Sequence, residues 1–298
     1  MKQNLLNLLP LFINEDEAMQ FAFNSNMLAV GKCCPNRECF GTLQLIKDNS
    51  ERTGYRVKCD KCGTKISIFF NSIFNRAKLE VHQILHLIYY WSQRASIQTT
   101  EHETGISKMT ISSFFIILRD SASDWNEKHF AQIGGEGTIV EIDESQYSKR
   151  KSNAGRIVPN SDVWLFGGIC RNTKECFVVP VADRTHETLM PLIQKYIAPG
   201  THIISDCWRA YTMIEEYGYE HSTVNHSLNF IDPITGAHTQ NIERLWREVK
   251  KSKKQYNGVP DDQIDSHIGE FMWRTRAGVN LDNAFWKSIE MIREGCYI

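Results

Sequence analysis

The sequence has no apolar run long enough to cross a membrane, no excess of positive charge and no internal repeat. A membrane-spanning helix needs ~20 apolar residues, whereas the N-terminal stretch LLNLLPLFI is short and is interrupted by Asn7 and Pro10. It runs into Asn14 and three acids, which predict a helix start rather than the cleavage region of a signal peptide. The formal net charge is −1, so any binding of nucleic acid must depend on local basic patches.

The chain has the length and the apolar content for more than one domain. Its 298 residues suggest about two domains, and 42% hydrophobic residues with 11% aromatic residues can fill a sizeable core. The glycine-rich stretch AQIGGEGT, residues 131–138, lies between a helical region and a strand-rich region. We therefore expect the main domain boundary at this stretch.

Five of the nine cysteines lie close together in the N-terminal part of the chain. Cys34-x4-Cys39 is followed, after nineteen residues, by Cys59-x2-Cys62, so two short loops can each present two thiolates to one tetrahedral Zn²⁺ ion. The segment between the pairs predicts a β-hairpin, and the whole predicts a zinc ribbon. A disulfide pair or unligated core thiols are the alternatives; an odd cysteine total and the expected lack of a signal peptide favour zinc. Between Cys33 and Cys34 we choose Cys34, because the proline that follows it suits a metal-binding turn.

The region after the ribbon changes to a helical period. Apolar residues recur at helical spacing in LEVHQILHLIYYWSQR, and SIQTTEHETGISKMTISSFFIILRD predicts two helices separated by Gly105. Helix, glycine turn and helix are the order of a helix-turn-helix, with Ser107 placed to cap the second helix and Lys108 facing outward. A plain three-helix packing module would show the same pattern. The neighbouring zinc ribbon favours DNA binding.

The strand-rich region predicts a mixed α/β domain. TIVEIDES, DVWLFGGICR and ECFVVPVADR predict three strands in a meander, the first of them ending in acids. After these come a helix (HETLMPLIQKYI), a strand (THIISD), a helix stopped by Gly218 (WRAYTMIEEYG), a strand (YEHSTVNH) and a last helix (NIERLWREVKK). A meander followed by alternating helices and strands is the ribonuclease-H-like α/β order.

Three acids lie at the ends of these elements. Asp143 closes the first strand, Asp206 closes the strand after the first helix, and Glu243 heads the last helix, which then turns basic. Active groups of open α/β sheets gather at the carboxyl ends of strands, so we expect the aspartates side by side with Glu243 reaching in. Converging carboxylates repel each other unless cations neutralise them, and hard oxygen ligands select Mg²⁺ or Mn²⁺. Two such ions can activate a water or a 3′-hydroxyl for attack on a phosphodiester.

Each of these residues also has an ordinary structural interpretation. An aspartate at a strand end is commonly a turn residue, and a glutamate at a helix start is a favourable partner of the helix dipole. A lysine-rich run is commonly a solvated face. Trp208 and Trp246 are expected to be core aromatics rather than platforms for base stacking. The order of the acids beside a zinc ribbon favours catalysis over these separate explanations.

Longer stretches support the catalytic interpretation. They are VEIDESQYSKRK, WLFGGICR, VPVADR, PGTHIISDCWRAY and VNHSLNFIDPITGAHTQNIERLW with the lysine run that follows. From the N-terminal helix to about Arg276, the chain resembles the Merlin superfamily of cut-and-paste DDE transposases and their bacterial insertion-sequence relatives. The resemblance implies an enzyme that binds terminal inverted repeats, cuts the element ends and joins the 3′ ends to target DNA.

Carried over by position, the resemblance implies that Asp143, Asp206 and Glu243 form a triad that holds Mg²⁺ or Mn²⁺. Some bacterial relatives have asparagine at the position of Gln240. Gln240 and Glu243 share one helix face, whereas Asn241 lies off it, so we assign the third ligand to Glu243. The implied partner is double-stranded DNA, as element ends and target, bound by a homodimer or a higher homo-oligomer without any membrane.

Basic residues near the acids are predicted to contact the DNA backbone. The loop after Asp143 has four basic residues and no acid among them. His238 precedes the last helix, where it is placed to orient a metal ligand or to touch phosphate; a loop histidine held by the backbone is an equal alternative. The predicted DNA contacts are Lys108, Lys149, Arg150, Lys151, Arg156, His238, Arg244, Arg247, Lys250 and Lys251.

The predicted protein is multidomain, α+β and α/β. We expect an N-terminal helical segment at 1–30, a zinc ribbon at 31–75, a helical helix-turn-helix region at 76–130, a ribonuclease-H-like DDE catalytic domain at 137–277 and a C-terminal helical tail at 278–298. Two other functions stay open: a non-catalytic DNA-binding protein, against which the intact triad argues, and a metal-dependent nuclease on the same fold. We expect the protein in the nucleus of a eukaryotic host or in the cytoplasm of a bacterial one.

Overall fold

The chain divides into two units that do not simply follow the order of the sequence. The computed structural model describes residues 5–75, 77–148, 163–224, 238–256 and 259–295. One unit combines Met1–Lys128 with Ala277–Ile298, and the other is the continuous stretch His129–Arg276. No helix among the described residues is long and apolar enough to span a membrane.

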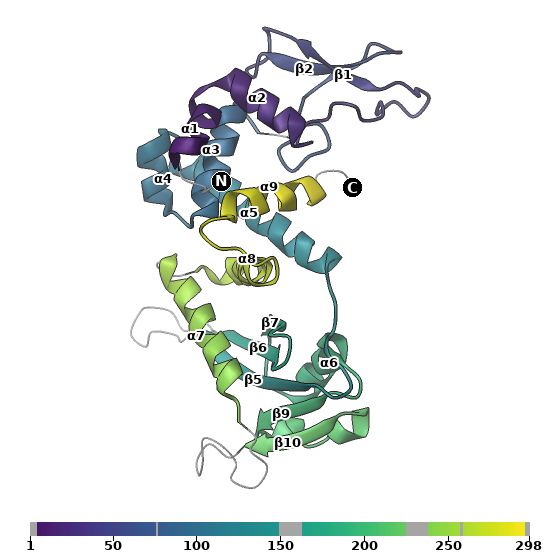
Figure 1. Ribbon diagram of the computed structural model, residues 1–298, viewed down its shortest axis with the longest axis vertical. Helices are drawn as coiled ribbons and strands as arrows, with labels where there is room; N and C mark the ends of the chain where they lie inside the picture. The colour runs from purple at the N-terminus through teal and green to yellow at the C-terminus, as the bar shows by residue number, and fades with distance from the viewer. Residues whose placement is uncertain (1–4, 76, 149–162, 225–237, 257–258, 296–298) are drawn as a thin grey trace, which may run out of the picture. The chain divides into compact units, whose positions relative to one another are not determined.

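The first unit consists of helices and one small sheet (Figure 1). Its sheet has the strand order β1-β2-β3, and the hairpin of β1 and β2 confirms the strand pair predicted between the cysteine pairs. Asn14 caps α2 as predicted, because its side chain accepts hydrogen bonds from the backbone N–H groups of Asp16 and Glu17. The elements are α1 (Leu5–Ile13), α2 (Glu15–Asn24), β1 (Leu43–Lys47), β2 (Tyr55–Cys59), β3 (Lys65–Ile66), α3 (Val81–Ser92), α4 (Ile97–Thr104), α5 (Lys108–Lys128) and α9 (Ala284–Gly295).

The C-terminal helix α9 packs into this first unit rather than forming a separate tail. Phe285 of α9 is fully buried, and its ring lies 6.2 Å from that of Phe12 and 6.1 Å from that of Phe21, between centroids. The apolar face of α9 thus completes a core made by the first two helices and by α3. Helix α9 therefore belongs structurally with the N-terminal region.

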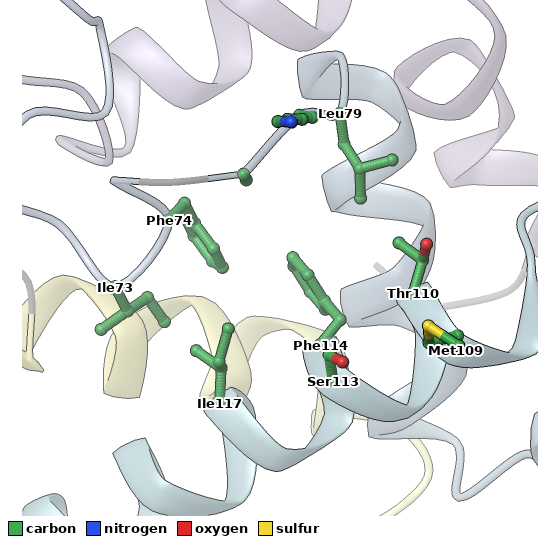
Figure 2. Close-up of a pocket in the computed structure, with 10 residues that line it drawn as sticks. Ile73, Phe74, Leu79, Met109, Thr110, Ser113, Phe114 and Ile117 are labelled. Carbon is green, nitrogen blue, oxygen red and sulfur yellow. The ribbon is translucent and has the colours of Figure 1, made fainter.

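Helices α4 and α5 have the predicted order of helix, glycine turn and helix. Gly105 ends α4 in the left-handed conformation, at φ 68°, and the Ser107 hydroxyl accepts from the backbone N–H of Thr110 at 3.4 Å. The rings of Phe74 and Phe114 stack 5.3 Å apart beside this turn. They belong to a pocket of about 350 Å³ between the segment before α3 and the start of α5 (Figure 2). Its walls are mainly apolar.

The second unit is built on a five-stranded sheet with the order β10-β9-β5-β6-β7. Strands β5, β6 and β7 form an antiparallel meander, whereas β9 is parallel to β5 and β10 is parallel to β9. This is the predicted ribonuclease-H-like order. The elements are β4 (Ile133–Gly134), β5 (Ile139–Ser148), β6 (Val163–Cys170), β7 (Cys176–Val181), α6 (His186–Tyr196), β8 (Ile197–Ala198), β9 (His202–Asp206), β10 (Glu220–Val224), α7 (Gln240–Gln255) and α8 (Ile264–Arg276), with the 3₁₀ helices η1 (Arg209–Tyr211), η2 (Ile214–Tyr217) and η3 (Asp261–Gln263).

Helices cover both faces of this sheet. Alternate residues of a strand point to opposite faces, so Val140 and Ile142 of β5 pack in the core that includes α6. Tyr147 of β5 and Leu165 of β6 pack in the other core, with α7 and α8. In Figure 1, α7 runs beside β5 and β6. Odd-numbered residues of β5 therefore face α7.

Two local predictions in this unit were wrong. Strand β5 does not end at Asp143 but continues to Ser148, because its residues beyond Asp143 pair with β6. The segment WRAYTMIEEYG forms η1 and η2 instead of one α-helix, although Gly218 does end it in the left-handed conformation, at φ 85°. The two helical pieces have three and four residues, which is the length at which the 3₁₀ form is common.

Candidate active site and cysteine cluster

Asp143 and Asp206 lie level with each other on neighbouring strands. The parallel register pairs Val140 with Ile203 and Glu141 with Ile204, and two further residues along both strands lead to Asp143 and Asp206. Side chains level with each other on adjacent strands point to the same face. If the register continues, both aspartates belong to the face of the sheet that α7 covers, at the point where β9 ends.

Helix α7 contacts Asp143 directly through a tryptophan. The indole Nε1 of Trp246 donates a hydrogen bond to Asp143 Oδ2 at 2.9 Å. Gly167 of β6 pairs with Asp143, and a Cβ at Gly167 would lie 2.8 Å from Trp246 Cη2. The glycine thus leaves the space through which the indole reaches the aspartate. Trp246 is 5% exposed, which confirms it as a core aromatic.

The start of α7 is held by a buried carboxylate that the sequence analysis did not single out. Glu141 is 0% exposed, and its Oε2 accepts from the backbone N–H groups of Asn241 at 2.8 Å and Ile242 at 3.0 Å. Its Oε1 accepts from Asn241 Nδ2 at 2.7 Å and from Arg171 Nε at 2.6 Å. A carboxylate at a helix N-terminus satisfies free N–H groups and interacts favourably with the helix dipole. Glu141, two residues before Asp143, therefore fixes α7 against β5.

Glu243 lies on the exposed side of α7 next to the row of Trp246. The two residues are three positions apart, which makes them neighbours on a helix surface. Arg247 and Lys250 follow Glu243 at four and seven positions and are also exposed. The predicted third acid therefore heads a basic stripe on the solvent side, while Ile242, Leu245, Trp246 and Val249 are buried.

Another carboxylate lies on the opposite face of β5. Glu144 accepts a hydrogen bond from the Tyr211 hydroxyl. Burial raises the pKa of Glu144 to about 7, and the negative charges of Asp143 and Asp206 act in the same direction.

Comparison with known proteins identifies the unit that carries these acids. Residues 132–276 match the family model described as the ISXO2-like transposase domain. The matched stretch is just under half of the chain, and it is similar to that transposase domain. The match confirms the resemblance to insertion-sequence DDE transposases that the sequence motifs indicate. An uncharacterized transposase-like protein of Haemophilus influenzae is 24% identical over 98 residues, which are 33% of this chain and 78% of that protein.

Two solved structures give weaker likenesses to the chain. The integrase catalytic core domain of HTLV-2, in complex with magnesium, is 18% identical at a TM-score of 0.32 and covers 47% of this chain and 84% of its own. A simian T-cell lymphotropic virus intasome, in complex with a PP2A regulatory subunit, is 14% identical at a TM-score of 0.32, with 65% of this chain and 69% of that chain covered. The fold of the transposase domain is therefore assigned from its strand order, β10-β9-β5-β6-β7, and not from these likenesses.

Several predicted site residues of the transposase domain have structural partners. Asn241 binds Glu141 and accepts from Lys174 Nζ at 3.3 Å, so it anchors the helix, whereas Gln240 is exposed. The backbone carbonyl of His238 accepts from Arg171, and its Nδ1 lies 3.6 Å from Glu141 Oε1. These contacts favour a role for His238 in holding the start of α7 in position.

The predicted basic contacts are only partly described. Arg244, Arg247, Lys250 and Lys251 are exposed on α7. Lys108, at the start of α5 in the other unit, is exposed and lies 3.3 Å from Glu101 Oε2. The remaining predicted contacts lie outside the described residues: Lys149, Arg150, Lys151 and Arg156.

Trp208 corrects a prediction, because it is not a core residue. It is 38% exposed, and its backbone N–H donates to Asp206 Oδ1 at 2.9 Å. The strand ends at Asp206, so the chain leaves the sheet before Trp208 and carries the indole to the surface.

The cysteine pairs of the first unit converge on one point. Their four sulfur atoms all lie within 4.8 Å of one another. The Sγ atoms of Cys34 and Cys62 are 3.5 Å apart, and those of Cys39 and Cys59 are 3.6 Å apart. A tetrahedral site with Zn–S bonds of about 2.3 Å requires sulfur separations of about 3.8 Å, so the set fits Zn²⁺. Cys33 is exposed and lies outside the set, as the choice of Cys34 requires.

Among the described residues, one further set of side chains has the spacing of metal ligands: Glu15, Glu80 and His82. Glu15 accepts from the backbone N–H groups of Val81 at 3.0 Å and His82 at 2.9 Å, at the start of α3. This set is accounted for as a helix cap. Asp143, Asp206 and Glu243 do not form such a set within the same 4.8 Å limit in the described part of the chain.

Proposed function

We propose that the chain is a DNA transposase that cuts element ends and joins them to target DNA, with Asp143, Asp206 and Glu243 as its metal-binding acids. The observation that carries the proposal is the β5–β9 register, which pairs Glu141 with Ile204, two residues before Asp143 on one strand and two before Asp206 on the other. It does so inside a transposase domain. Glu243 comes from the helix that Trp246 and Glu141 hold against the same strand.

The donors present suit a hard divalent cation. Carboxylate oxygens are the ligands that Mg²⁺ and Mn²⁺ prefer. Trp246 orients one oxygen of Asp143, and the backbone N–H of Trp208 orients one oxygen of Asp206. Bound Mg²⁺ or Mn²⁺ would neutralise these acids and stabilise the attacking and leaving oxygens of a phosphodiester.

The basic stripe on α7 is placed to hold the DNA strand. Arg247 and Lys250 lie one and two turns beyond Glu243 and face solvent. Arg and Lys side chains position a duplex through its phosphates and make the binding dependent on salt. The same role is proposed for the other predicted contacts except His238: Lys108, Lys149, Arg150, Lys151, Arg156, Arg244 and Lys251.

The first unit is proposed to recognise the element ends. Its cysteine set would hold a structural Zn²⁺, and α4 with α5 would form the helix pair that contacts DNA. Transposition joins two ends to one target, so we propose that a homodimer or a higher homo-oligomer assembles on the DNA.

Strand cleavage and strand transfer on labelled element ends, with and without Mg²⁺, test the proposal. Alanine at Asp143, Asp206 or Glu243 should reduce cleavage at least about 10–100-fold, as changes around metal ligands commonly do. Gel shifts should show DNA binding retained. Gln240→Ala, at an exposed position one turn away, is the matched control. Cleavage without joining would favour a nuclease, and normal cleavage by all three acid variants would contradict the assignment.

A further inference from the structure

An arginine lies between two tryptophans next to Asp206. The guanidinium carbon of Arg184 is 3.9 Å from the ring centroid of Trp164 and 4.4 Å from that of Trp208. Trp164 is on β6, Arg184 is on the loop between β7 and α6, and Trp208 is just after β9. Contacts of this kind are stabilised by cation–π attraction, and they join three segments that are distant in sequence.

Hydrogen bonds fix the outermost ring of this stack. The Trp208 indole Nε1 donates to the backbone oxygen of Arg184 at 3.0 Å, and the Trp208 backbone N–H donates to Asp206 Oδ1 at 2.9 Å. The loop of Arg184 is itself fixed, because Asp183 Oδ1 accepts from the Thr185 backbone N–H at 3.0 Å and from the Thr188 hydroxyl at 2.6 Å. The indole is therefore held in one orientation before any ligand binds.

Trp208 is nevertheless exposed. Its surface is 38% accessible although Arg184 covers one face of its ring, whereas Trp246 and Trp273 of the same unit are buried. A large aromatic side chain that is held rigidly but left in solvent gains little from the fold. Tryptophan is enriched at binding interfaces because it combines a large apolar ring with a polar N–H, and rigid aromatics lose little conformational entropy on binding.

We propose that Trp208 is a stacking platform for an unpaired nucleobase of the DNA strand at the acids. The inference rests on the proposed function and specifies a ligand subsite for it. Trp208 is two residues from Asp206, at most about 7 Å of chain, and its backbone N–H donates to Asp206 Oδ1, so a DNA strand held at Asp206 would pass near this residue. Arg209, the next residue, is exposed and adds a positive charge for the adjoining phosphate.

The ligand is a base that has left the duplex. Bases in a duplex already stack on each other, so an aromatic ring receives only an extruded base or one at a single-stranded end. Every base has a π-face, so the subsite accepts any of the four. It therefore binds the strand next to the cleavage point without reading its sequence.

The test compares two DNAs on the full-length protein in buffer without Mg²⁺. Both are duplexes with a single-stranded extension at one end, identical in phosphates, but one extension carries bases and the other carries abasic sugars. Wild-type protein should bind the base-containing DNA about tenfold more tightly, which is the scale of one base–aromatic stack. Trp208→Ala should bind the two DNAs equally, at the wild-type affinity for the abasic DNA.

Further variants separate stacking from other effects. Trp208→Phe should retain part of the preference for bases, and Trp208→Leu, which keeps an apolar side chain against Arg184, should lose it. Phe130→Ala removes another exposed aromatic of the same unit and should behave as wild type. The salt dependence of binding should be the same in all variants, because the phosphates are unchanged.

The outcomes separate this inference from the proposed function. If wild-type protein binds both DNAs equally, or if Trp208→Ala and Trp208→Leu keep the wild-type preference, Trp208 is not a platform, whether or not the protein cleaves DNA. If the preference depends on Trp208 but no DNA is cleaved in Mg²⁺, the subsite stands and the catalytic proposal fails. Quenching of a 2-aminopurine in the extension by wild type, and its loss in Trp208→Ala, gives the same comparison spectroscopically.

Discussion

The indole Nε1 of Trp246 donates a hydrogen bond to Asp143 Oδ2 over 2.9 Å. The two residues are 103 positions apart in the sequence, and Gly167 provides the space that lets them meet. One oxygen of Asp143 is thereby fixed in orientation, on the face of the sheet that also carries Asp206. Partners of this kind orient metal ligands and tune their affinity.

Replacing Trp246 by phenylalanine should lower activity through Asp143. Trp246→Phe keeps an aromatic ring in the core but removes the donor, so we expect cleavage to fall about 10–100-fold, as loss of an orienting partner commonly does. The Mg²⁺ concentration for half-maximal activity should rise, and DNA binding should be unchanged. Trp273→Phe is the control, since it is the same change at a buried tryptophan of α8. Equal losses in both variants would indicate general destabilisation instead.

Removing the charge of Glu141 should destabilise the transposase domain. Glu141→Gln leaves Arg171 without its carboxylate partner and weakens the cap of α7. Breaking a buried ion pair by removing one partner commonly costs about 3–5 kcal/mol, and we expect a loss of that order in urea unfolding. Glu248→Gln, at an exposed position on the same helix, should change the free energy of unfolding by less than about 0.5 kcal/mol. A Glu141→Gln protein as stable as wild type would show that Glu141 does not anchor α7.

The neighbouring residues Cys33 and Cys34 should differ in zinc binding: Cys34 should be a ligand and Cys33 should not. We expect about one Zn²⁺ per chain by metal analysis, bound by Cys34, Cys39, Cys59 and Cys62. Hydrogen bonds from the side chain and backbone of Thr64 lower the pKa of Cys62, which favours the thiolate that binds metal. Cys34→Ser should abolish stoichiometric zinc, whereas Cys33→Ser should retain it. The reverse result would exchange the two ligands, and no zinc in wild type would exclude the ribbon site.

The C-terminal helix should stabilise the N-terminal unit. Phe285→Ala removes a fully buried ring from the contact with Phe12 and Phe21, and such changes cost about 3–5 kcal/mol. Hydrogen exchange should increase in α3 and α5 and stay unchanged in β5 and β9. Leu281→Ala, at an exposed position before α9, is the matched control. Faster exchange confined to the central sheet would assign α9 to the transposase domain instead.

Local patterns in the sequence determined most elements and their order. The three strand-rich segments after residue 138 predicted β5, β6 and β7, and the cap at Asn14 and the turn at Gly105 predicted where helices begin and end. The spacing of the cysteine pairs predicted a cluster that the structure brings together. These features depend on side chains a few residues apart, because caps, turns and amphipathic faces are local properties.

The tertiary structure decided the surroundings of the acids. Glu141 holds Asn241 across 100 positions of sequence, and no local pattern distinguishes it from the neighbouring acids of the same strand. The same holds for the partnership of Trp246 with Asp143, for the exposure of Trp208 and for the packing of α9 into the first unit. Each depends on which surfaces meet once distant segments fold together, and long-range contacts leave no periodic signal in the chain. The sequence by itself therefore named the three candidate acids, and only the fold showed what positions two of them.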